Sequence, residues 1–175
     1  MARVPRRADA AQRLNALFWD ASALAKGFTS EPGSDNVLGA FTISRGRGFV
    51  SEFVMIEVLT VLAKHYRAGL FSKAGYATAV SEFFRDYPRG FNLVEVDEAV
   101  RRRTVGLAQS LKAMSLGALD LLHLSTAVQV QSLVAPHQVV FASADGALLA
   151  AARGRGLATY NPERDPLSAL VRLLH

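Results

Sequence analysis

The sequence predicts an α/β protein of one domain, built from a parallel β-sheet with helices on both faces. Short apolar segments that are typical of strands alternate along the chain with longer helical segments. Aspartates follow three of the apolar segments, directly at Asp20 and Asp97 and after two residues at Asp145, where a residue that caps a helix is expected. Because a parallel connection needs a crossover long enough to be a helix, this alternation favours a parallel sheet.

The first half of the chain is expected to contain one strand and four helices. Ser22 is placed to cap the first helix, and Gly46 and Gly48 indicate a loop. The expected segments are a strand at Leu14–Trp19 and helices at Ala21–Lys26, Asp35–Phe41, from Ser51 or Glu52 to Gly69, and Ser72–Tyr87, the last ended by Pro88 and Gly90.

The second half is expected to contain three strands and four helices. Alternating apolar and polar residues predict its first strand, and Asp97 caps the basic helix that follows. The expected strands are Phe91–Val96, Gln138–Ala142 and Leu157–Tyr160, and the expected helices are 97–114, 116–134, Gly146–Arg153 and Pro166–Leu174.

Composition excludes several classes of protein. The 175 residues, half of them hydrophobic, are enough for one domain and exclude disorder over most of the length. The absence of cysteine removes disulfides, zinc–thiolate sites and thiol nucleophiles. No apolar run is long enough to span a membrane and no export signal is found, which fits a cytoplasmic protein. The net charge of +5 is compatible with a polyanionic partner and equally with simple solubility.

Four acidic residues stand where ligands bind or where an unpaired carboxylate is costly. Asp20 and Asp145 each follow the carboxyl end of an expected strand, the place where parallel sheets bind ligands. Glu57 and Asp120 lie among apolar residues of expected helices, so each needs a proton, an arginine or a metal ion as compensation. Each acid alone also fits a simpler role, as a helix cap, a turn residue, an exposed edge or half of a buried ion pair.

As a group, the four acids favour a metal site. Two carboxylates about 4 Å apart repel by roughly 4 kcal/mol at an effective dielectric constant near 20, so a cluster of them requires cations or protons. Oxygen ligands select Mg²⁺ or Mn²⁺. Such a pocket in a basic protein suits hydrolysis of a phosphodiester, because the cation activates water while arginines hold the polyanion.

Five fragments of the sequence, in order and at matching spacing, resemble a known family. They are Trp19–Leu24, Glu31–Ser34, Glu57–Leu59, Leu119–Leu124, and Phe141–Asp145 with Asn161–Pro162 downstream. The chain is similar over Leu14 to Pro162 to the PIN-domain ribonucleases, and specifically to the VapC-like toxins of bacterial and archaeal toxin–antitoxin pairs. The resemblance implies a PIN domain at residues 14–175 with a parallel sheet between helices.

The resemblance also implies roles for the four acids. Asp20 and Asp120 are expected to bind the metal directly, Asp145 to complete the pocket, and Glu57 to reach into it from its helix. The implied activity is cleavage of RNA that depends on Mg²⁺ or Mn²⁺. Small hydroxyl positions beside the acids, at Ser22 and Ser143, are expected either to bind water or a carboxylate or to make local turn bonds.

The implied partners are an RNA substrate, a second copy of the chain in a homodimer, and a cognate VapB-like antitoxin, all in a prokaryotic cytoplasm. Two alternatives stay open: a nuclease of the same fold that processes RNA without an antitoxin, and a non-catalytic interaction module. A nucleotide-binding protein is disfavoured, because no Gly-Lys-Ser/Thr loop is present.

Basic stretches and one histidine complete the expectations. Residues 1–13 precede the family's usual start, as a basic extension or as the product of an upstream start codon, and 44–48 replaces a plainer loop and strand. The arginines of 44–48, of 153–156 and of 101–103 are candidates for RNA contact, with structural or solvated roles as the alternative. His123 is expected in the core or behind the metal ligands rather than as a ligand.

Overall fold

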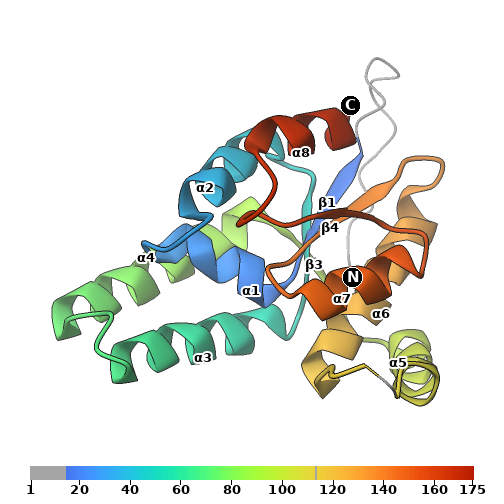
Figure 1. The fold of residues 1–175 in the computed structure, drawn as a ribbon, viewed down its shortest axis with the longest axis horizontal. Helices are drawn as coiled ribbons and strands as arrows, with labels where there is room; N and C mark the ends of the chain where they lie inside the picture. The colour runs from blue at the N-terminus through green and yellow to red at the C-terminus, as the bar shows by residue number, and fades with distance from the viewer. Residues whose placement is uncertain (1–14, 113) are drawn as a thin grey trace.

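The computed structural model describes residues 15–112 and 114–175, and it confirms the α/β fold. Five parallel strands form one sheet in the order β3-β2-β1-β4-β5 (Figure 1). The expected extension at residues 1–13 lies outside the described residues and stays a prediction. The strands are β1 (Ala16–Trp19), β2 (Gly48–Ser51), β3 (Asn92–Val94), β4 (Val139–Ala142) and β5 (Ala158–Tyr160).

Helices connect successive strands and cover both faces of the sheet. In the described part of the chain they are α1 (Ala21–Leu24), the 3₁₀ helix η1 (Ala25–Phe28), α2 (Ser34–Ile43), α3 (Val54–Arg67), α4 (Lys73–Gly90), α5 (Glu98–Ser110), α6 (Ala118–Val134), α7 (Gly146–Arg153) and α8 (Leu167–Leu174). The α3–α4 pair extends away from the sheet (Figure 1). None of the described helices is both long and apolar enough to cross a membrane.

Two apolar cores form because successive side chains of a strand point to opposite faces. Leu17 and Trp19 pack against helices α1 to α4 and α8. Phe18, between them in sequence, packs on the other face against α5, α6 and α7, and its ring stacks on Phe141 of β4 at 5.7 Å between centroids. Each such fully buried side chain contributes about 1.5–3 kcal/mol to folding.

Strand β2 was not expected, because its glycines indicated a loop. Gly48 begins the strand instead, and a Cβ built there would lie 3.1 Å from the ring of Phe91. The neighbouring Arg47 donates hydrogen bonds to the carbonyl oxygens of Ile43 at 2.7 Å and Asn15 at 3.1 Å. Its guanidinium therefore links the end of α2 and the residue before β1 to the start of β2. The segment forms a strand because its backbone pairs with β1 and β3. This pairing depends on tertiary context and is not visible in the local sequence.

Two local expectations were wrong. Asp20, not Ser22, caps α1, because its carboxylate accepts the Ser22 N–H at 3.1 Å. Helix α4 continues through position 88 to Gly90, because a proline near a helix end removes one N–H donor with only a short stretch of helix to follow.

The sheet order places two loops side by side at the carboxyl edge of the sheet. Strands β1 and β4 are neighbours, with Trp19 opposite Ala142, although β1 leads to β2 on one side and β4 to β5 on the other. Ligands of parallel sheets bind at such a switch point. The residues that follow these strands, Asp20 and Ser143, therefore stand at the expected rim.

Candidate metal centre

Asp20 is a buried carboxylate at the end of β1, with 2% of its surface exposed. Its Oδ2 accepts hydrogen bonds from the Ser22 backbone N–H at 3.1 Å, the Ser22 hydroxyl at 2.5 Å and the Ser143 hydroxyl at 3.0 Å. Burial raises the pKa of Asp20; the charge of His123 and the Ser22 bond oppose the rise, and Glu57 adds to it. The fold thus keeps a carboxyl group out of water, where its charged form would be better solvated.

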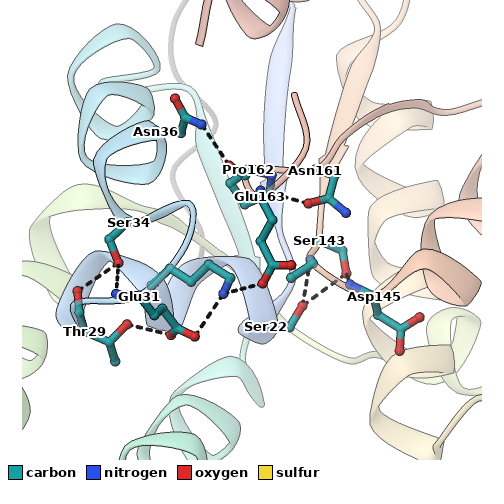
Figure 2. Close-up of polar contacts among 12 residues, drawn as sticks. Ser22, Thr29, Glu31, Ser34, Asn36, Ser143, Asp145, Asn161, Pro162 and Glu163 are labelled. Carbon is teal, nitrogen blue, oxygen red and sulfur yellow. Dashed lines mark hydrogen bonds and ion pairs between the residues drawn. The ribbon is translucent and has the colours of Figure 1, made fainter. Parts of the chain in front are cut away.

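The two serines connect the loops after β1 and β4. Their hydroxyl oxygens are 3.1 Å apart, and the Ala144 N–H donates to Ser22 Oγ while the Asp145 N–H donates to Ser143 Oγ, both at 3.0 Å (Figure 2). The contacts include both bonds to a carboxylate and local turn bonds, the two roles expected from the sequence.

Glu57 reaches the same place from the first turn of α3. Its side chain is 24% exposed, and its Oε2 lies 2.6 Å from Nε2 of His123 on α6. One potential ligand atom from each of Asp20, Glu57 and His123 lies within 4.8 Å of the other two. Residues from three separate segments therefore form one compact group.

Asp120 lies near this group but outside it. Its Oδ2 accepts the Gly117 N–H at 2.7 Å, so it completes the first turn of α6 as a capping residue. Burial raises the pKa of Asp120; the Gly117 bond opposes this, and the charges of Asp20, Glu57 and Asp145 raise it further. The charges of the other three acids therefore all act on Asp120.

Asp145 is the N-cap of α7. Its Oδ1 accepts the backbone N–H groups of Ala147 at 2.7 Å and Leu148 at 2.9 Å. The carboxylate is turned away from the Ser22–Ser143 pair in Figure 2, and Asp145 does not belong to the compact group of three.

The four acids share one pattern. Each accepts its hydrogen bonds through a single oxygen, and no donor among the described residues bonds the other oxygen: Oδ1 of Asp20, Oε1 of Glu57, Oδ1 of Asp120 and Oδ2 of Asp145. No lysine or arginine in the described part of the chain forms an ion pair with any of them. The carboxylates therefore have open ligand atoms, and the imidazole of His123 contacts one of them, Glu57.

Lys26 is a buried lysine whose partners are two glutamates outside the acidic group. Lys26 Nζ lies 2.6 Å from Glu163 and 3.1 Å from Glu31, and these two glutamates lie on neighbouring loops in Figure 2. Asn36 Nδ2 also donates to the Pro162 carbonyl at 2.8 Å. These contacts hold the loop after β5 against the loop before α2.

Sequence reasoning missed Ser51, which was taken only as the start of a helix. Ser51 ends β2, is fully buried, and its Oγ lies 2.7 Å from Nδ1 of His123. The expectation that His123 lies in the core is confirmed, since none of its surface is exposed. The three-residue spacing of Asp120 and His123 places both on one face of α6 and is a signal for His123; no local pattern pointed to Ser51.

Several of the basic stretches have structural contacts. Arg47 bonds two carbonyl groups, as described above, and Arg101 and Arg103 donate to the carbonyl oxygens of Val96 at 2.7 Å and Ser125 at 3.2 Å. Arg45 is exposed. RNA contact by these arginines stays a prediction.

The chain is similar in sequence to known proteins. A family model described as the PIN domain matches residues 17–154. Ribonuclease VapC47 from Mycobacterium tuberculosis is 26% identical over 149 residues, covering 83% of this chain and 96% of that protein.

Two solved structures share the fold. FitAcB from Neisseria gonorrhoeae has a TM-score of 0.62 at 16% identity, covering 85% of this chain and 99% of its own. PAE2754 from Pyrobaculum aerophilum has a TM-score of 0.59 at 19% identity, covering 91% of this chain and 89% of its own.

Proposed function

Because the chain belongs to the PIN-domain family, we propose that it is a metal-dependent ribonuclease and the toxin of a VapBC-type toxin–antitoxin pair. The relative named Ribonuclease VapC47 supports the activity, since it aligns with most of both chains. The proposed site residues are Asp20, Glu57, Asp120 and Asp145, with Mg²⁺ or Mn²⁺ as the ion.

One observation carries the proposal: Asp20 is buried beside Glu57 with no lysine or arginine paired to either in the described part of the chain. A buried acid without a compensating charge costs several kcal/mol, so the fold retains it for a purpose other than stability. Open carboxylate oxygens are the ligands that Mg²⁺ and Mn²⁺ prefer. The donor set therefore fits a hard divalent cation.

The chain's own residues then act as a preorganised cradle. Ser22 and Ser143 fix one oxygen of Asp20, and the caps of α6 and α7 fix one oxygen of Asp120 and of Asp145. When bound, the cation would neutralise charge on the phosphodiester and lower the pKa of the attacking water.

The test measures cleavage of RNA by the full chain with Mg²⁺, with Mn²⁺ and with excess EDTA. Asp20→Asn and Asp120→Asn are expected to abolish cleavage. Asp97→Asn is the matched control, because Asp97 caps α5 through the Val100 N–H outside the acidic group. Cleavage that persists in EDTA, or wild-type rates in both site variants, refutes the proposal.

An antitoxin and a second copy of the chain are the proposed protein partners. Arginine's fork binds carboxylates in a bidentate manner, so an acidic pocket suits a basic side chain of an inhibitor. Expression of the chain alone and with its genomic neighbour tests this part. Equal growth in both cases, with no complex on co-purification, favours a nuclease that acts without an antitoxin.

A further inference from the structure

His123 joins three elements of the fold at the candidate metal centre. It lies on α6 with none of its surface exposed. Its Nδ1 is 2.7 Å from Ser51 Oγ at the end of β2, and its Nε2 is 2.6 Å from Glu57 Oε2 on α3. Both ring nitrogens therefore have a partner.

The chemistry of the partners gives the direction of the bond to Glu57. An ionised carboxylate only accepts hydrogen bonds, so Nε2 must carry the hydrogen that it shares with Oε2. The Ser51 hydroxyl can donate to a bare Nδ1 or accept from a protonated one. A hydrogen on Nε2 occupies the position through which the ring would otherwise bind a cation.

We infer that His123 is a positioning residue: held by Ser51, it fixes one oxygen of Glu57 and leaves the other open for a cation. The inference rests on the proposed function. Asp20 supports it by analogy within the same site, since Ser22 and Ser143 fix only its Oδ2. In both Asp20 and Glu57, the hydrogen bonds from neighbouring side chains go to one carboxylate oxygen and leave the other without a donor. Removing such a partner typically weakens metal binding by about 10–100-fold.

Two substitutions separate positioning from simple packing. The amide nitrogen of His123→Gln reaches about as far as Nε2 and can donate to Glu57, whereas the shorter His123→Asn can reach Ser51 but not Glu57. Both variants replace the imidazole ring with an amide, so they are matched in polarity. Titration of the metal-free full chain with Mn²⁺, followed by the loss of the free-ion EPR signal, measures the affinity of each protein.

His123→Asn is expected to weaken Mn²⁺ binding by about 10–100-fold, with His123→Gln within roughly threefold of the wild type. Thermal melts in EDTA accompany the titration, and the two variants are expected to melt at similar temperatures. If both variants bind Mn²⁺ equally more weakly than the wild type, His123 either binds the metal directly or acts through packing, and the inference is overturned. Unchanged affinity in both also overturns it.

A measurement without metal tests the hydrogen bond directly. Nitrogen-15 NMR of the imidazole in the metal-free protein is expected to show a hydrogen on Nε2, alone or together with Nδ1. A bare Nε2 with the hydrogen on Nδ1 overturns the inference. If the wild type binds no Mn²⁺, the proposed metal-dependent function fails, while the NMR result still decides how His123 and Glu57 are joined.

Discussion

Replacing Asp20 by Asn separates the charge of this residue from its role as a helix cap. Asparagine caps helices about as well as aspartate, so the bond to the Ser22 N–H can persist. The negative charge, which is buried beside Glu57, is lost. We expect the metal-free Asp20→Asn protein to be more stable than the wild type near pH 7.

The magnitude follows from the separation of the charges. Ligand atoms of Asp20 and Glu57 lie within 4.8 Å of each other, which corresponds to a repulsion of about 3 kcal/mol at an effective dielectric constant near 20. His123 offsets part of this repulsion, so a net gain of about 1–3 kcal/mol is expected. In a domain of this size that gain raises the melting temperature by on the order of 5 °C.

The assay is thermal unfolding of the wild type, Asp20→Asn and the control Asp97→Asn, each in EDTA and in Mg²⁺. Bound Mg²⁺ at a hundredfold excess over Kd should stabilise the wild type by about 2.7 kcal/mol and Asp20→Asn by less. An Asp20→Asn protein that melts at or below the wild-type temperature in EDTA refutes the reasoning, because Asp20 would then serve mainly as structure.

Three further outcomes are expected in thermal melts. Gly33→Ala should destabilise the protein more than Gly46→Ala. Both glycines have positive φ, of 92° and 78°, but of the two only Gly33 would bring the new Cβ against a backbone oxygen, that of Pro162 at 2.9 Å. Equal losses of melting temperature in the two variants would contradict this. Tyr160→Phe should stabilise by about 1 kcal/mol, because the buried hydroxyl has no hydrogen-bond partner in the described part of the chain; a lower melting temperature would show that the hydroxyl is satisfied. The raised pKa of Asp20 means that the folded state binds a proton more tightly than the unfolded state. In EDTA, lowering the pH from 7 towards the ordinary pKa of 3.8 should therefore stabilise the wild type relative to Asp20→Asn. Melting temperatures of the two proteins that change in parallel with pH would exclude this.

The sequence by itself determined the fold class and the acids at the sheet's rim. Strands β1 and β4 are continuous apolar runs. Asp20 follows β1 directly and Asp145 follows β4 after two residues, so their position and their capping role are local properties of the chain. Helix α5 began after Asp97 as expected for the same reason. Features set by a few neighbouring residues are visible in sequence because short-range propensity governs them.

Only the tertiary structure decided how the acids are held. The bonds of His123 to Glu57 and to Ser51 cross 66 and 72 residues of chain, and strand β2 exists because β1 and β3 pair with it. Contacts of this kind depend on which elements pack together, and no local pattern specifies that packing. Which oxygen of each carboxylate is bonded, and which is left open, is therefore settled by the assembled fold.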